Sequence, residues 1–281
     1  MASTWLITGS SSGFGRLIME KALKRGDRVA ATSRDITKLA ALEEGYSGKL
    51  LPLELDLTNI ASVRATVDAA FQQFGRIDVV VSNAGYGLLG AAEEATDMQV
   101  RNIIDTNLVA SIALIQACLP HLRKQKSGRI LQVSSEGGQI AYPGFSLYHA
   151  TKWGIEGFVE AVGKEMAAFG IELSLIEPGP ARTNFVNSVV RTDYLKAYDG
   201  TPAHLTAEYI DSGAWVIKGD PVRMADAMMR LADQDQPLPK RLVLGADAFE
   251  GVRSALVERL TELDAQKQIS IAADFTPEEL D

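Results

Sequence analysis

A tyrosine and a lysine, Tyr148 and Lys152, stand four residues apart in the stretch "SLYHATKWG". The stretch has no proline and no strand-like alternation, so it predicts a helix, in which positions i and i+4 share one face. A phenol has a pKa of about 10, poorly matched to proton exchange at neutral pH, and a neighbouring ammonium group lowers that pKa. The pair could therefore handle a proton together, although two polar residues at this spacing are also common on ordinary helix surfaces.

Ser135 lies 13 residues before Tyr148, directly after the apolar run "RILQVS" at 129–134. If that run is a strand of a parallel sheet, its carboxyl end faces the crevice in which such sheets bind nucleotides. A substrate oxygen held there could accept hydrogen bonds from Ser135 and Tyr148. Those bonds would stabilise negative charge that develops on the oxygen.

Seven short apolar runs, separated by longer segments of helical periodicity, must position these residues. The runs lie at 4–8, 28–32, 49–55, 77–82, 129–134, 171–177 and 241–245. Steady alternation of strand and helix predicts a parallel sheet with helices on both faces, and nearly continuous apolar strands fit burial on both sides. The predicted fold is therefore α/β, a doubly wound, mostly parallel, seven-stranded Rossmann-like sheet in a single domain.

We expect the whole chain, 1–281, to form one dinucleotide-binding catalytic domain with two additions. At about 184–220 the alternation gives way to a mixed aromatic and polar stretch, which predicts a substrate lid. Residues 246–281 predict a helical extension. The aromatic residues that could line an apolar pocket, or equally belong to the core, are Tyr142, Phe145, Phe185, Tyr194 and Tyr198.

The first apolar run ends in "TGSSSGFG", residues 8–15, and leads directly into a helical pattern. Glycines at this place allow a tight turn and the close approach of a pyrophosphate, which the following helix N-terminus favours electrostatically. We therefore expect the turn to bind a dinucleotide. The cofactor-binding residues predicted here are Gly9, Ser11, Ser12, Gly13, Phe14 and Gly15.

Seven short motifs follow one another in order along residues 4 to about 183. They are "TGSSSGFG", "DLT" at 56–58, "NAG" at 83–85, "TN" at 106–107, "SS" at 134–135, "YHATK" at 148–152 and "PGPART" at 178–183. In these motifs the chain resembles the short-chain dehydrogenase/reductase family, in its single-domain branch. The resemblance implies the catalytic set Asn107, Ser135, Tyr148 and Lys152, in which Asn107 holds a water that links Lys152 to solvent.

The same resemblance implies the remaining contacts with the nucleotide. Lys152, beside Tyr148, would bind the nicotinamide ribose. Asp56 and Leu57 would hold the adenine. The backbone of Asn83, Ala84 and Gly85 would line the nucleotide. Pro178 and Gly179 would support the nicotinamide, and Thr183 would bond its carboxamide.

The second apolar run is followed by a possible determinant of cofactor choice, in "ATSRD" at 31–35. In the family register Ser33 occupies the place of an acidic residue that would bind a ribose 2′-OH. Arg34 comes next, and a guanidinium can bind a 2′-phosphate. We therefore expect NADP(H) rather than NAD(H). The alternative is that Arg34 is a solvated residue at the start of a helix and Asp35 its N-cap.

Composition argues against several other classes of protein. The formal net charge is −8 with no run of Lys or Arg, so neither nucleic acid nor a membrane is an expected partner. Cys118 is the only cysteine and the three histidines are scattered, so no metal site is expected. The sequence shows no signal-peptide pattern, and no apolar run approaches the roughly 20 residues that span a bilayer. We expect a cytoplasmic protein.

The sequence thus predicts an oxidoreductase that transfers a hydride between NADP(H) and a carbonyl or secondary alcohol with an apolar body. A non-catalytic dinucleotide-binding regulator or scaffold is the alternative. Such a protein would be expected to have lost Ser135, Tyr148 or Lys152, and the chain retains all three. The family resemblance also implies a homodimer or homotetramer built through the helices at 108–122 and 148–169.

Overall fold

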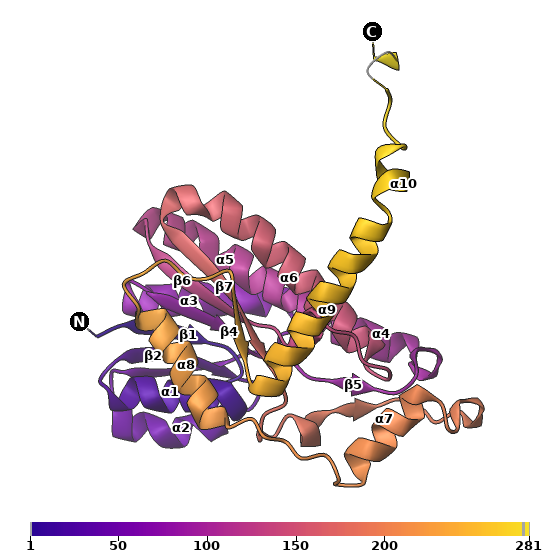
Figure 1. The fold of residues 1–281 in the computed structure, drawn as a ribbon. Coiled ribbons are helices and arrows are strands. Elements are labelled where there is room, and N and C mark those ends of the chain that lie inside the picture. The colour runs from indigo at the N-terminus through magenta and orange to yellow at the C-terminus, as the bar shows by residue number, and fades with distance from the viewer. Residues whose placement is uncertain (1, 277–278, 281) are drawn as a thin grey trace.

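The computed structural model describes residues 2–276 and 279–280, and its centre is a seven-stranded parallel sheet (Figure 1). The strand order is β3-β2-β1-β4-β6-β7-β9. The strands are β1 (Thr4–Ile7), β2 (Arg28–Ser33), β3 (Leu50–Glu54), β4 (Val79–Ser82), β6 (Gly128–Val133), β7 (Ile171–Pro178) and β9 (Arg241–Leu244). Each predicted apolar run forms one of these strands, so the predicted fold is confirmed.

Apolar side chains on successive strand positions pack on opposite faces of the sheet. Trp5 and Ile7 belong to the core on one face, whereas Leu6 belongs to the core on the other. All three are fully buried. This two-sided burial explains why the strands are continuous apolar runs and do not alternate with polar residues.

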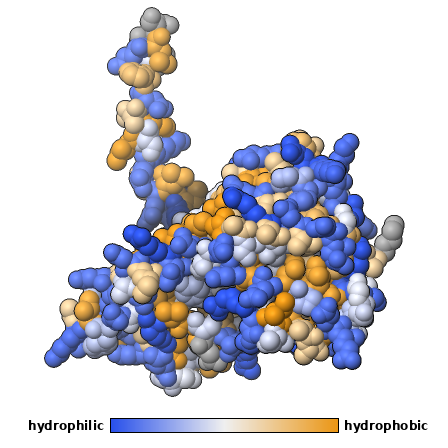
Figure 2. Space-filling view, turned by 180° about the vertical axis from the view of Figure 1, so that it is seen from behind, coloured by the Kyte–Doolittle hydropathy of each residue, from blue (hydrophilic) through white to orange (hydrophobic). Residues whose placement is uncertain are grey.

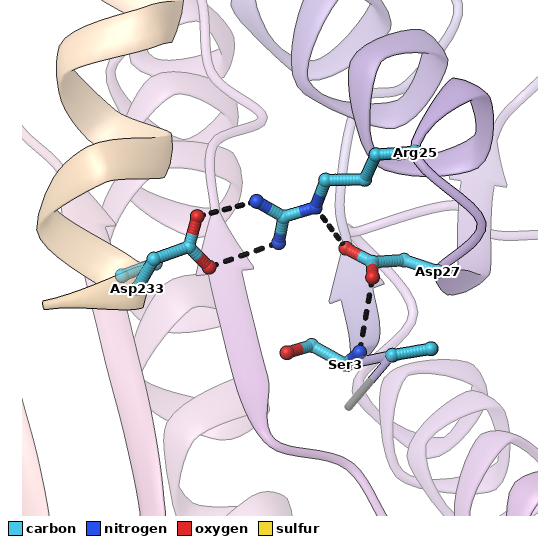
Figure 3. A pocket seen from close by; sticks show the side chains of 6 residues that line it. Ser3, Arg25, Asp27 and Asp233 are labelled. Carbon is cyan, nitrogen blue, oxygen red and sulfur yellow. Dashed lines mark hydrogen bonds and ion pairs between the residues drawn. The ribbon is translucent and has the colours of Figure 1, made fainter.

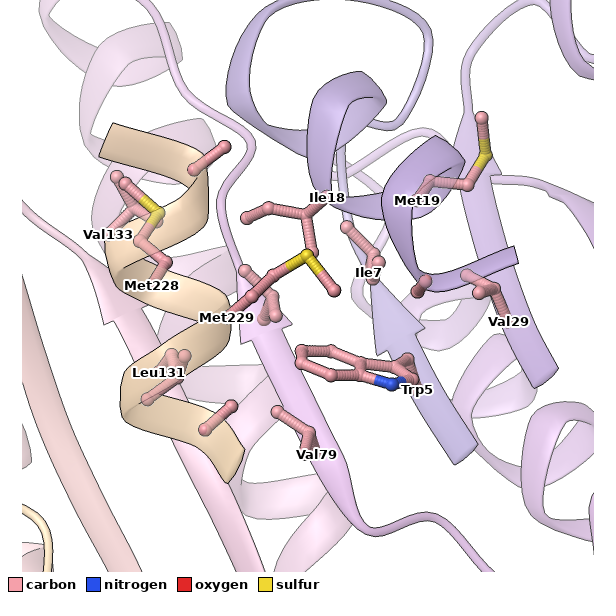
Figure 4. Packing of buried hydrophobic residues seen from close by; sticks show 14 of the residues in the cluster. Trp5, Ile7, Ile18, Met19, Val29, Val79, Leu131, Val133, Met228 and Met229 are labelled. Atoms are coloured by element: carbon pink, nitrogen blue, oxygen red, sulfur yellow. The ribbon is translucent and has the colours of Figure 1, made fainter. Parts of the chain in front are cut away.

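Helices cover both faces, as the alternation predicts (Figure 1). One face carries α1 (Gly13–Lys24), α2 (Thr37–Glu43) and α8 (Pro221–Asp233). Figure 4 shows Met228 and Met229 of α8 packed with Trp5 and Ile18 in this core. The other face carries α3 (Ile60–Phe74), α5 (Ala110–Gln125) and α6 (Ser146–Met166).

The chain builds outward from β1 to β3 and then returns to start β4 on the other side of β1. In such sheets the crevice at the carboxyl ends of the strands, where the order reverses, is the place where ligands bind. The residues predicted to bind the nucleotide or to act in catalysis follow β1, β2, β3, β4, β6 and β7 or lie on helices beside them. The fold therefore brings the predicted site to one edge of the sheet.

One helical run combines α4 (Asp97–Ile104), a π-helical turn (Asp105–Val109) and α5. By length and hydropathy this run, Asp97–Gln125, could cross a membrane, although 44% of its most apolar window is buried inside the protein. Its α5 part lies against α3, and Leu114, Ile115 and Cys118 are buried in the shared core. Core packing accounts for the hydropathy of this run.

The two predicted additions have structure of their own. Segment 184–220 contains the short strand β8 (Val190–Arg191), which pairs with β5 (Leu88–Leu89), and helix α7 (Pro202–Asp211). The C-terminal part forms α9 (Ala246–Ala265) and α10 (Lys267–Ile271), which project from the body (Figures 1 and 2). The last part of the predicted extension, at 277–278 and 281, lies outside the described residues.

Candidate active site

Tyr148 and Lys152 lie one turn apart on α6, as the spacing predicts. Lys152 Nζ stands 5.6 Å from the centre of the Tyr148 ring and donates a hydrogen bond of 3.1 Å to Val133 O at the end of β6. Ser135 follows the same strand, and its side chain is hydrogen-bonded to Tyr148. The structure therefore brings together the three residues that were predicted to handle the proton and the substrate oxygen.

Burial shifts the pKa of both proton-handling groups towards their neutral forms. Burial raises the pKa of Tyr148 to about 12, against a lowering effect of the Ser135 hydrogen bond, and Glu136 raises it further. Burial also lowers the pKa of Lys152 to about 8, although Glu156 opposes that shift. We expected the Lys152 ammonium to lower the pKa of Tyr148. In the protein without cofactor that expectation is wrong, because burial destabilises the Tyr148 phenolate more than its neighbours stabilise it.

Ser135 has an extended backbone and begins a short turn, Glu136–Gly138, at the carboxyl end of β6. Its Oγ accepts a hydrogen bond of 3.0 Å from Gly137 N. The hydroxyl hydrogen is then available to donate to an oxygen beside Tyr148. This geometry suits stabilisation of a negatively charged oxygen.

Asn107 is buried in the π-helical turn between α4 and α5. Its amide nitrogen donates to Tyr86 O at 2.8 Å and to Thr151 Oγ1 at 3.3 Å, while Oδ1 accepts from Tyr86 N at 3.0 Å. These bonds connect the loop after β4 to the residue preceding Lys152. Single π-helical turns inside α-helices are frequent at functional sites. The water relay through Asn107 stays a prediction.

The glycine turn after β1 closes against the loop after β4. Gly9 and Gly13 have positive φ angles of 69° and 57°, a backbone conformation that side chains disfavour. A Cβ on Gly15 would overlap Gly9 O and lie 2.7 Å from Asn83 Nδ2. Asn83 donates from Nδ2 to Thr8 O at 2.9 Å, which fixes the two loops together. Close backbone packing of this kind is what a dinucleotide cradle requires.

The serines and Phe14 complete that turn in different ways. Ser12 is exposed at the start of α1 and makes no side-chain cap bond, so the first backbone N–H groups of the helix remain available to an anion. Ser11 is half-buried beside it. The Phe14 side chain packs against the core, so only its backbone faces the turn.

Arg34 follows β2 and is exposed, close enough to Asp56 and Tyr86 for its charge to affect both groups. Hydrogen bonds from Thr58 lower the pKa of Asp56, and Arg34 adds to that effect. The Asp56 carboxylate thus also caps a local turn. Leu57 packs partly against the core, and Ala84 and Gly85 lie in the loop after β4.

The residues after β7 return to the same crevice. Pro178 ends the strand, and Gly179 N donates to Leu244 O at 2.9 Å. A Cβ on Gly179 would lie 2.9 Å from Ala248 Cβ, so α9 packs directly on this turn. Thr183 Cβ lies 3.8 Å from where a Cβ on Gly13 would be, which places Thr183 opposite the glycine turn.

A small apolar cavity of about 40 Å³ lies between the body and segment 184–220. Two of the five predicted pocket aromatics, Phe145 and Phe185, line it, and their rings lie 6.1 and 5.9 Å from the Tyr148 ring. Tyr142, Tyr194 and Tyr198 do not line this cavity. The sequence reasoning missed its other lining residues, which are Leu89, Val186, Val189, Arg191, Ile210 and Trp215.

Sequence reasoning also missed a buried hydrogen bond between Glu94 and His204 that fixes part of segment 184–220. Glu94 Oε1 lies 2.6 Å from His204 Nε2 and accepts a bond of 2.9 Å from Leu195 N, while its Oε2 accepts from Thr192 Oγ1 at 3.2 Å. Hydrogen bonds from these groups and from Ala91 hold the pKa of Glu94 at about 2, against the effect of burial. The portion 192–204 is therefore anchored to the body of the protein.

A second hollow of the surface lies away from this site, at the amino ends of the strands (Figure 3). It is lined by Ala2, Ser3, Arg25, Asp27, Ala232 and Asp233. Arg25 pairs there with Asp233 and Asp27. Within residues 2–276 and 279–280, no cluster of three His, Cys, Asp or Glu side chains could hold a metal ion.

A family model described as short chain dehydrogenase matches residues 3–193. The chain is 35% identical over 275 residues to the oxidoreductase BOA17 of Botryotinia fuckeliana, covering 97% of this chain and 100% of that protein. It is 37% identical over 196 residues to human 17-beta-hydroxysteroid dehydrogenase type 1, covering 66% of this chain and 58% of that protein.

Solved structures agree with these matches. A short-chain dehydrogenase from Streptomyces avermitilis has a TM-score of 0.88 and 33% identity, covering 97% of this chain and 98% of that one. ElxO with NADP bound has a TM-score of 0.74 and 25% identity, covering 89% of this chain and 100% of that one. A Burkholderia phymatum protein of the same fold is in complex with NAD, at 21% identity and a TM-score of 0.76, covering 90% of this chain and 92% of that one.

Proposed function

Because the chain belongs to the short-chain dehydrogenase family, and is therefore an oxidoreductase of that type, we propose that it is an NADP(H)-dependent carbonyl reductase or alcohol dehydrogenase (EC 1.1.1.-). The observation that carries the proposal is the placement of Ser135, Tyr148 and Lys152 around one point at the carboxyl edge of the sheet. A scaffold without turnover would not need this arrangement.

The glycine turn fits a dinucleotide, because Gly9 and Gly15 leave room for close approach where side chains would collide with backbone. When bound, the nicotinamide supplies or accepts the hydride. Thr183, which lies opposite the glycine turn, would bond the nicotinamide carboxamide. Lys152 would bind the ribose.

In the direction of reduction, Tyr148 donates its phenolic proton to the substrate oxygen while Ser135 donates a hydrogen bond to the same atom. The raised pKa of Tyr148, about 12, keeps the phenol protonated at neutral pH, which is the form that reduction requires. The lowered pKa of Lys152, about 8, lets that amine exchange a proton near neutral pH. Asn107 would hold the water that returns the proton from solvent.

We propose NADP(H) as the preferred cofactor on the basis of Arg34, which lies beside Asp56 at the end of β2. The test is the thermal shift given by NADPH and by NADH. NADPH should give the larger shift, and Arg34→Ala should remove the difference, whereas Arg64→Ala, an exposed arginine on α3, should not. Equal shifts for the two nucleotides in the unchanged protein would contradict the assignment.

We further propose a carbonyl or secondary alcohol substrate with an apolar body. The support is the apolar lining of the cavity beside Tyr148, with Phe145 and Phe185 on its wall. The steroid name of one relative is consistent with this class of substrate. A screen of ketones and alcohols by nicotinamide absorbance tests it, and turnover confined to small polar carbonyls would contradict it.

A cytoplasmic location and a homodimer or homotetramer through α5 and α6 complete the proposal. Trp153 is 43% exposed on α6, and a Cβ on Gly157 one turn later would meet nothing within 4 Å. Such an open face suits helix packing between subunits. Light scattering on Gly157→Trp, which places a bulky side chain there, should report a smaller assembly than the unchanged protein.

A further inference from the structure

The turn that carries Ser135 is held against α6 by His149; we call residues 134–142 the serine turn. His149 Nδ1 lies 2.8 Å from Gly137 O, and its Nε2 accepts a hydrogen bond of 2.8 Å from Tyr142 N. A backbone carbonyl can only accept and a backbone N–H can only donate. The imidazole is therefore neutral, with its hydrogen on Nδ1.

Glu156 holds the serine turn from the other end of the same helix face. Its Oε1 accepts from Ser134 Oγ at 2.6 Å and its Oε2 from Gln139 Nε2 at 2.5 Å. The carboxylate is 3% exposed, and Arg241 of β9 donates to it at 3.0 Å. A buried charge that is paired and hydrogen-bonded in this way is costly to disturb.

The backbone of the serine turn packs directly against the side chains of His149 and Glu156, with no space for a further side-chain atom. A Cβ on Gly137 would lie 2.8 Å from His149 Cε1, and a Cβ on Gly138 would overlap Glu156 Oε1. Gly157, on α6 itself, has nothing within 4 Å of its Cβ position. The serine turn can therefore pack on α6 in one position only. Gly137 and Gly138 are required because a larger residue at either place would collide with His149 or Glu156.

We propose that His149 and Glu156 are positioning residues that fix Ser135 relative to Tyr148 by holding the serine turn against α6. His149 directly follows Tyr148, and Glu156 lies one turn after Lys152. Helix α6, which carries Tyr148 and Lys152, therefore also determines the position of Ser135. The inference rests on the proposed function, in which Ser135 and Tyr148 bond the same oxygen. A displacement of about 1 Å can cost about 100-fold in rate.

The contact at His149 also makes the placement sensitive to pH. The titratable groups that face or adjoin His149 are Tyr148 on α6 and Tyr142 and Glu136 on the serine turn; Asp247 of α9 acts on Glu136. A second ring proton would point at Tyr142 N–H and break that bond. Burial lowers the pKa of His149 below its usual value of 6.5. The hydrogen bonds of neutral His149 are therefore intact above about pH 6.5, and the bond from Tyr142 N is lost as the pH falls towards the lowered pKa.

Replacing His149 with phenylalanine keeps the aromatic packing and removes both hydrogen bonds. We expect H149F to lower kcat about 10- to 100-fold and to leave the KM for NADPH within about twofold. An acid limb of kcat caused by His149 should also disappear. The matched control is H121F, because His121 is a helical histidine that stacks on Phe71, remote from the serine turn. An unchanged kcat and acid limb in a folded H149F would overturn the proposal.

A second pair of variants approaches the contact from the other side. G138A should displace the serine turn from Glu156 and lower kcat at least about tenfold. G45A, in the turn before β3 where nothing lies within 4 Å of the Cβ position, should leave kcat unchanged. This pair decides the question if H149F does not fold. Equal activity of G138A and G45A would overturn the proposal.

A readout that needs no substrate separates this inference from the proposed function. In ¹⁵N-labelled histidine spectra at pH 7.5, His149 should show a neutral ring that is protonated on Nδ1. A charged ring or the opposite tautomer would overturn the inference even if the enzyme turned over ketones. Absence of turnover in the unchanged protein, with the expected spectrum, would instead contradict the proposed function.

Discussion

The two edges of the sheet both carry clusters of polar side chains, but their titratable groups shift in opposite senses. At the amino edge, Arg25 bonds both Asp233 and Asp27, and the Asp233 bond raises the pKa of Arg25 (Figure 3). At the carboxyl edge, burial raises the pKa of Tyr148 and lowers that of Lys152. Charges are paired at the first edge, whereas neutral forms are favoured at the second.

The larger of the two hollows is not at the candidate active site. The amino-edge hollow measures about 520 Å³, and the cavity beside Tyr148 about 40 Å³. What distinguishes the site is that burial shifts the pKa values of two adjacent titratable groups, Tyr148 and Lys152, towards their neutral forms. Changes at the carboxyl edge should therefore affect activity, and changes at the amino edge should affect stability alone.

The largest effect is expected from Gly15→Ala, because the new Cβ would overlap Gly9 O. The glycine turn must shift, so the thermal shift with NADPH should be lost and the free energy of unfolding should fall by about 1–3 kcal/mol. Gly45→Ala is the matched control, since nothing lies within 4 Å of its Cβ position. Retained NADPH binding in Gly15→Ala would contradict the assignment of the glycine turn as the dinucleotide-binding site.

Lys152→Met should separate activity from stability. We expect kcat to fall about 100- to 1,000-fold, and the free energy of unfolding at pH 7 to rise by about 1–3 kcal/mol because a buried ammonium is removed. The pKa of Lys152 is about 8 in the folded protein against 10.5 unfolded, so the gain is complete below pH 8 and vanishes as the pH rises through 10.5. Urea unfolding at pH 7 and pH 10.5 measures it; a loss of stability at pH 7 would contradict the sign.

Asp27→Asn tests the other edge. Asp27 accepts from Trp5 Nε1 at 2.9 Å, from Ser3 N at 3.0 Å and from Arg25 Nε at 2.6 Å, so an amide would oppose donors with donors. The free energy of unfolding should fall by about 2–4 kcal/mol, with kcat and KM unchanged below the melting transition. A changed kcat would show that the two edges are coupled.

The smallest expected effect is the loosening of residues 192–204 at low pH. The pKa of Glu94 is lowered from 4.5 to about 2, so its contribution to stability is complete above 4.5 and is lost as the pH falls through 2. Limited proteolysis with pepsin should cut within 192–204 faster as the pH approaches 2. Glu94→Gln should weaken this pH dependence; an unaltered profile would contradict the anchor.

The parts of the fold that depend on sequence-local patterns could be predicted from the sequence. The seven strands were predictable because two-sided burial makes them continuous apolar runs, and Tyr148 and Lys152 because helical spacing fixes their common face. The glycine turn was predictable because positive φ at Gly9 and Gly13 requires glycine.

The rest depends on contacts between residues far apart in the chain. Glu94 and His204 are 110 residues apart, and nothing local marks either as a partner of the other. The direction of the Tyr148 pKa shift required knowledge of burial, since the spacing shows only that a lysine is near. Likewise, Tyr194 stacks on His204 at 4.7 Å and does not reach the cavity, which aromatic composition alone could not show.

The most direct test of the account is the turnover of Tyr148→Phe on any ketone that the unchanged protein reduces. The variant loses only the phenolic oxygen, so the NADPH thermal shift should be retained while kcat falls at least about 1,000-fold. Ser3→Ala, at the amino edge, serves as the control and should keep full activity. Retained turnover in Tyr148→Phe would contradict the assignment of Tyr148 as the proton donor.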